Sequence, residues 1–190
     1  MRFKLFIEAI IKYILGLLIV GFLLFIPGTL KYKQGWVLMA ILFIPMFIAG
    51  IVMVIKNPEL LRRRLNNKEK NKEQKVVIII SGIMFISGFI LAGLSYRFSW
   101  FILPNYISWI GVISFLISYI LYAEVLRENT YLSRTIEVDN NQKLIDTGLY
   151  KIVRHPMYLV TIILFLSIPL ILGSIISFII FLIYPFKSII

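Results

Sequence analysis

The stretch GLYKIVRHPMYLV holds the only histidine of the chain, between an arginine and a proline. Proline is favoured at the first position of a helix, where its missing N–H would have no partner, so we expect a helix to begin at Pro156. Arg154 and His155 would then lie at a helix N-terminus, which favours a nearby anion. Arginine adds charge-assisted hydrogen bonds to carboxylate or phosphate. The residues predict an anion site, and the alternative is an interfacial anchor in which Tyr150 and Tyr158 meet lipid headgroups.

Other reactive groups are few. The chain has no cysteine, which excludes disulfides, thiolate metal sites and a cysteine nucleophile. No metal is expected, because His155 has no partner ligands for a zinc ion. Glu124 and Glu128 would share a helix face, and we interpret them as charges near a membrane boundary rather than as an acid and base pair. Asn129 either borders a pocket or caps a helix end.

The composition is that of a membrane protein. Of the 190 residues, 60% are hydrophobic, whereas soluble domains have about 45 to 50% apolar residues. Several apolar runs exceed the ~18 to 20 residues that cross a hydrocarbon core. We therefore predict an all-α fold: a polytopic helical membrane protein in the lipid bilayer, forming one domain with about five transmembrane segments. The excess of 20 Lys and Arg over 9 Asp and Glu lies in no basic soluble module, so no nucleic acid partner is expected.

The predicted elements alternate between apolar and polar. We predict a helical hairpin in residues 1–55, with apolar segments at 11–30 and 35–55, followed by a basic loop at 56–75. Residues 76–125 should contain two spans, at 76–94 and 107–125, and residues 126–155 form a second polar stretch. The basic loop has no apolar face, which indicates a solvated linker or, alternatively, contact with anionic headgroups. Small residues in the third span could let helices approach closely: Ser81, Gly82, Ser87, Gly88 and Gly93.

The distribution of basic residues predicts the orientation. With the N-terminus inside, the inside segments hold fifteen Lys and Arg, and the outside segments hold only Lys31, Lys33 and Arg97. Cytoplasmic loops near spans carry such an excess. We expect an integral protein of the cell (plasma) membrane, with the N-terminus and both long polar stretches in the cytoplasm.

The final apolar run, 157–186, is too long for one untilted span, because 30 helical residues measure about 45 Å. Pro169 removes a backbone donor, and Gly173 with Ser174 offers a turn. Residues 156–190 therefore form either one kinked helix or a helical hairpin.

The motif resembles the G-x-Y-x-x-x-R-H-P-x-Y signature of the isoprenylcysteine carboxyl methyltransferase family, which is related to the phospholipid methyltransferases. The stretches NPELLRRR, YRFSW, ENTYLS and PLILGS match the same family in order and spacing. The resemblance covers about residues 57–184. It implies an integral membrane methyltransferase that uses S-adenosylmethionine and takes a lipophilic, possibly prenylated, substrate through an opening toward lipid.

The resemblance also assigns residues. It makes 126–155 the cytoplasmic cofactor loop. Arg154 belongs to the signature, and we interpret it as the catalytic residue, which would orient a carboxylate of either the substrate or the cofactor. The implied cofactor-binding residues are Gln142, Lys143, Leu144, Ile145, Tyr150, His155, Pro156, Met157 and Tyr158. A carboxylate is already nucleophilic, so methyl transfer to it needs alignment and desolvation more than a general base.

Three departures from the family bear on function. Gln142 replaces the usual histidine, although an amide can still hydrogen-bond. Val160 replaces a glycine and adds bulk beside the expected ligand. The sequence ends at YPFKSII, before the arginine and the pair of glutamates that follow in family members. The leading hypothesis is O-methylation of a prenylated cysteine or similar lipophilic acid. The alternatives are a phospholipid or small-molecule methyltransferase, and a truncated, non-catalytic membrane protein that binds lipid or a partner.

Overall fold

The computed structural model describes residues 2–65, 72–128, 148–153 and 156–182, and every named element in these ranges is a helix. The long helices are α1 (Arg2–Phe25), α2 (Lys33–Lys56), α4 (Lys72–Phe98) and α5 (Asn105–Glu128). Each of these four contains a stretch long and apolar enough to cross a membrane. The shorter helices are α3 (Pro58–Leu65), α6 (Leu149–Ile152), α7 (Pro156–Leu172) and α8 (Ile175–Phe181). The predicted all-α, polytopic membrane fold is therefore confirmed.

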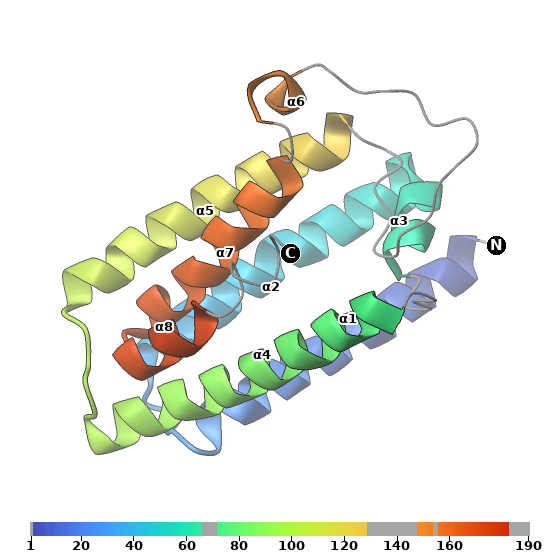
Figure 1. Cartoon of the computed structure of the whole chain (residues 1–190). Helices are drawn as coiled ribbons and strands as arrows, with labels where there is room; N and C mark the ends of the chain where they lie inside the picture. Colours follow the sequence, from blue (N-terminus) through green and yellow to red (C-terminus); the bar gives the residue numbers. More distant parts are fainter. Residues whose placement is uncertain (1, 66–71, 129–147, 154–155, 183–190) are drawn as a thin grey trace.

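The four long helices run side by side, and α7 packs along α5 (Figure 1). The start of α1, α3, the start of α4, the end of α5 and α6 lie at one end of the bundle, which we name the polar end. The α1–α2 and α4–α5 connections and the turn between α7 and α8 lie at the opposite, turn end. The two long polar stretches of the sequence thus begin and finish at the same end of the molecule.

Helix boundaries follow local chemistry. The first helix ends at Phe25, although the apolar run continues to Leu30, because Pro27 cannot supply the N–H that another turn requires. Pro45, in contrast, lies within α2. In the turn before Pro45, the carbonyls of Phe43 and Leu42 accept hydrogen bonds from the hydroxyls of Tyr13 and Tyr119, at 3.2 and 3.1 Å. These bonds join α2 to α1 and α5.

The final apolar run forms a hairpin. Pro169 lies inside α7 and does not end it. The break falls at Gly173, whose φ of +66° suits a residue without a side chain. The hydroxyl of Ser174 caps α8 by accepting a hydrogen bond from the N–H of Ser177 at 3.2 Å. Helix α8 then returns toward the middle of α4, where Phe181 contacts Phe85 edge to face.

The α7–α8 turn is fastened to the α4–α5 connection. The N–H of Leu103 donates to the carbonyl of Gly173 at 2.8 Å, and the N–H of Ile175 donates to the carbonyl of Phe101 at 3.3 Å. The buried hydroxyls of Ser174 and Ser95 lie 3.1 Å apart. These bonds join the hairpin to the α4–α5 connection and help to hold it in place.

Some of the small residues in the third span lie where two helices touch, and others do not. A Cβ on Gly88 would meet Phe181 at 2.3 Å, and a Cβ on Gly93 would meet the Leu24 carbonyl oxygen at 2.5 Å. These glycines allow the close approach predicted for them. A Cβ on Gly82 would meet nothing within 4 Å, and the hydroxyl of Ser87 bonds the Ile83 carbonyl of its own helix at 2.8 Å.

The basic stretch 56–75 differs from its prediction as a linker without an apolar face. It contains α3, in which Leu60 and Leu61 are buried against the bundle. Asn57 begins this helix by accepting a hydrogen bond from the N–H of Leu60 at 3.1 Å. The carbonyl of Leu65 accepts a bond of 2.6 Å from Lys12 of α1. The buried leucines and the bond from Lys12 thus attach to the bundle an eight-residue helix that is otherwise strongly polar.

Candidate functional site

The described part of the motif lies at the polar end, on two helices that follow each other in the chain. Tyr150 belongs to α6, and α7 begins at Pro156, as the proline predicts. Met157 and Tyr158 are in the first turn of α7. The other predicted site residues lie outside the described part of the chain: Gln142, Lys143, Leu144, Ile145, Arg154 and His155.

The four described site residues differ in burial. Pro156 is fully buried, Tyr150 and Met157 are half-buried, and Tyr158 is 52% exposed. The first turn of α7 therefore presents one face to the bundle and another outward. An aromatic ring and a thioether at such an edge suit an apolar or flat ligand group.

Glu128, a residue that the sequence did not assign to the site, contacts the start of α6. Glu128 is the last residue of α5, and its Oε2 accepts a hydrogen bond from the backbone N–H of Leu149 at 3.1 Å. Its carboxylate lies against Gly148: a Cβ built there would fall 1.3 Å from Oε1. The sequence predicts Glu128 only as a charge near a membrane boundary. Its spacing from Glu124 gave no hint of a partner 21 residues away.

Glu124 has a different partner. Its carboxylate accepts hydrogen bonds from both Nε and Nη2 of Arg127, at 2.9 and 2.5 Å. The two glutamates therefore do not act together as a pair. One forms an ion pair on the exposed side of α5, and the other contacts the backbone of α6.

One contact joins α3 to the same end of α5. The guanidinium carbon of Arg64 lies 5.3 Å from the centre of the Tyr122 ring, a cation–π geometry. Arg62 is exposed on the same helix. A basic helix thus lies at the polar end of the bundle.

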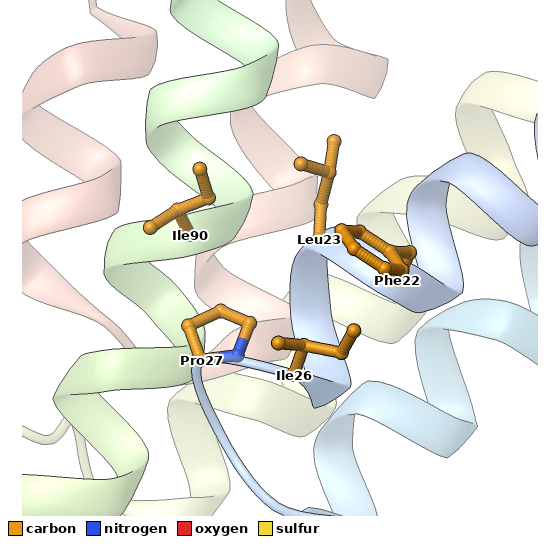
Figure 2. A pocket seen from close by; sticks show the side chains of 5 residues that line it. All are labelled: Phe22, Leu23, Ile26, Pro27 and Ile90. Carbon is orange, nitrogen blue, oxygen red and sulfur yellow. The ribbon is translucent and has the colours of Figure 1, made fainter.

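A hollow of about 220 Å³ lies away from this region (Figure 2). It is lined by Phe22, Leu23 and Ile26 of α1, by Pro27, and by Ile90 of α4. These residues belong to the turn end of the bundle, and their side chains are wholly apolar. The hollow therefore offers no group that could orient a polar reactant.

Comparison with known proteins gives a match in the C-terminal part of the chain. A family model described as phospholipid methyltransferase matches residues 106–189, a little under half of the chain. The matched part comprises nearly all of α5, together with α6, α7 and α8, and so contains the whole motif. No curated protein and no solved structure matches the chain significantly. Over residues 106–189 the chain is similar to the phospholipid methyltransferases, the broader group to which the resemblance of the motif had pointed.

Proposed function

We propose that this protein is an integral membrane methyltransferase that uses S-adenosylmethionine and acts on a lipophilic acceptor. The observation that carries the proposal is the family match, because it spans the helices on which the motif lies. The apolar helices support the location, since a lipophilic acceptor is concentrated in the bilayer that surrounds them.

The described residues fit the cofactor in kind. Tyr150, Met157 and Tyr158 offer aromatic and thioether surface to a flat base and an apolar chain, and hydroxyls that can hydrogen-bond a ribose or carboxylate. Gln142–Ile145, His155 and Pro156 complete the proposed binding set. When bound, S-adenosylmethionine supplies an electrophilic methyl group. The side chains would hold the acceptor in line with that group and exclude water.

A lipophilic carboxylic acid, such as a prenylated cysteine, is our first candidate for the acceptor. Its oxygen already carries the attacking electron pair, and transfer forms a C–O bond as the methyl C–S bond breaks. No proton has to be removed, which suits a motif without a second histidine. Arg154 would orient the carboxylate through paired hydrogen bonds.

A phospholipid amine is the second candidate, and the description of the matching family names phospholipids. A protonated amine must lose a proton before it attacks, so this reaction requires a base. The two candidates therefore make different demands on the same residues. A non-catalytic lipid-binding protein is the remaining alternative.

The proposed orientation places the polar end, and with it the site, in the cytoplasm at the plasma membrane. The excess of basic residues in 1–4, 56–75 and 126–155 supports this orientation. The methyl donor is a polar molecule, and this arrangement would give it access from the aqueous side while the acceptor arrives from the bilayer.

The test is transfer of labelled methyl groups in membranes that contain the protein. A farnesylated cysteine analogue and phosphatidylethanolamine are offered separately, and the product is treated with base. A base-labile methyl ester identifies the acid as acceptor, and a base-stable N-methyl product identifies the amine. His155→Ala and Tyr158→Ala should reduce transfer at least tenfold, whereas Lys151→Ala, an exposed change on α6, should retain it.

Calorimetry separates the catalytic proposals from the non-catalytic one. The purified protein should bind S-adenosylmethionine at micromolar to submillimolar concentrations. If it neither binds this cofactor nor transfers label to either acceptor, the methyltransferase proposal is wrong.

A further inference from the structure

The contact between Glu128 and α6 joins two points that are 21 residues apart in the sequence. The Leu149 N–H donates to Oε2 of this carboxylate, and a hydrogen bond to a carboxylate is stronger than one between neutral groups. The second oxygen, Oε1, occupies the space where a side chain at position 148 would begin. Both oxygens of Glu128 thus meet the start of α6.

Two observations describe what a side chain at position 148 would meet. Its φ of +52° and ψ of −123° are disfavoured for residues with a Cβ. A Cβ would also lie 2.3 Å from the Glu128 carboxyl carbon, far inside contact distance. The backbone conformation favours glycine at this position, and a Cβ there would displace the Glu128 carboxylate.

We infer that Glu128 is a positioning residue that fixes α6, and hence Tyr150, to the end of α5. Because α7 packs along α5, this contact sets Tyr150 relative to Met157 and Tyr158 at the start of α7. The consequence for cofactor binding rests on the proposed function. The structural part, the attachment of α6 to α5, does not.

The absence of cysteine from the chain makes the structural part directly measurable. Cysteines introduced at the exposed positions Ala123 and Lys151 carry spin labels on α5 and α6. Electron paramagnetic resonance then measures the distance between the labels in lipid nanodiscs. The background without further changes should give one narrow distance distribution.

Glu128→Ala should at least double the width of this distribution, and Gly148→Ala should do the same because its Cβ displaces the carboxylate. Glu128→Gln should stay narrow, since its amide oxygen can still accept the Leu149 N–H. Glu124→Ala is the matched control: it removes a carboxylate from the same helix end, one that bonds Arg127 instead. An unchanged distribution in Glu128→Ala would overturn the inference.

Cofactor binding tests the consequence separately. Glu128→Ala should weaken S-adenosylmethionine binding about tenfold, with kcat at saturating cofactor within about twofold of the unmodified protein. Glu128→Gln should restore the affinity to within about threefold. Unchanged affinity in a Glu128→Ala protein with a broadened distance distribution would refute the role in cofactor binding. If the unmodified protein binds no cofactor, the proposed function fails, and the distance measurement still decides whether Glu128 holds α6.

Discussion

Gly111 of α5 faces the backbone of α7 at Ile171. A Cβ on Gly111 would lie 2.7 Å from the Ile171 nitrogen and 2.9 Å from the Leu170 Cβ. Helices in a membrane associate largely through close packing, because lipid is as apolar as their side chains. The absence of a side chain at Gly111 therefore lets α7 lie directly on α5. The first turn of α7 carries the last residues of the motif.

Gly111→Ala should destabilise the protein by about 2 kcal/mol, since overpacking typically costs about 1 to 3 kcal/mol. The neighbouring atoms belong to a helix backbone and cannot move aside cheaply. Thermal unfolding in detergent would measure the change. Gly50→Ala is the matched control, because a Cβ on Gly50 in α2 meets nothing within 4 Å; equal effects of the two changes would contradict the packing argument.

The sequence predicted where helices lie better than which sides of them touch. Apolar runs and prolines identify the spans, because only a helix satisfies its backbone in lipid. Gly82 and Gly88 have the same residue type in the same span, yet only Gly88 meets another helix. The span is apolar on every side, so its pattern does not encode its rotation. The burial of Leu60 and Leu61 was not predicted, because two adjacent leucines among arginines do not form the repeating apolar pattern of an amphipathic helix.

The hydroxyl of Tyr32 donates to the carbonyl of Leu172, at the end of α7. Tyr32 is fully buried and stacks on Tyr96, with ring centres 4.3 Å apart. Burial raises the pKa of the Tyr32 phenol, which keeps the hydroxyl protonated and able to donate. This bond ties the connection between α1 and α2 to the final hairpin.

Tyr32→Phe should lower stability by about 1 to 3 kcal/mol, because it leaves a buried carbonyl without a partner. Tyr106→Phe, at a side chain that is 65% exposed, should change stability by less than about 0.5 kcal/mol. Chemical unfolding monitored by circular dichroism would compare the two. A Tyr32→Phe protein as stable as its control would show that the Leu172 carbonyl finds another donor.

Arg64 and Tyr122 should be energetically coupled. A double-mutant cycle with Arg64→Ala and Tyr122→Leu should give a coupling of about 0.5 to 1 kcal/mol, the range of exposed cation–π pairs. The cycle isolates this pair from the other contacts that each residue makes. Arg62 is exposed on the same helix, and Arg62→Ala should show no coupling to Tyr122→Leu. Equal coupling at both arginines would indicate a general charge effect instead.

The site was predictable in its local features and not in its long-range contacts. Pro156 begins α7 because proline suits that position in any helix. The bond between Glu128 and Leu149 depends on how α6 lies on α5, and no periodic pattern records that relation. Gly148 carried a signal that could have been used, since a glycine directly before a short helix often marks a positive φ.

Replacing Val160 tests whether its side chain crowds a bound ligand or packs in the protein core. From the sequence we expected its side chain to add bulk beside a ligand, but in the structure Val160 is only 2% exposed. Val160→Gly should therefore cost about 2 to 4 kcal/mol, from the lost buried methyl groups and the lower helix propensity of glycine. The affinity for S-adenosylmethionine should not improve.

Thermal unfolding and calorimetry on the same preparations measure stability and cofactor affinity. Thr161→Ala is the adjacent control, because the Thr161 hydroxyl bonds the Met157 carbonyl of its own helix. Cofactor binding that becomes tenfold tighter in Val160→Gly would show instead that this side chain restricts the site.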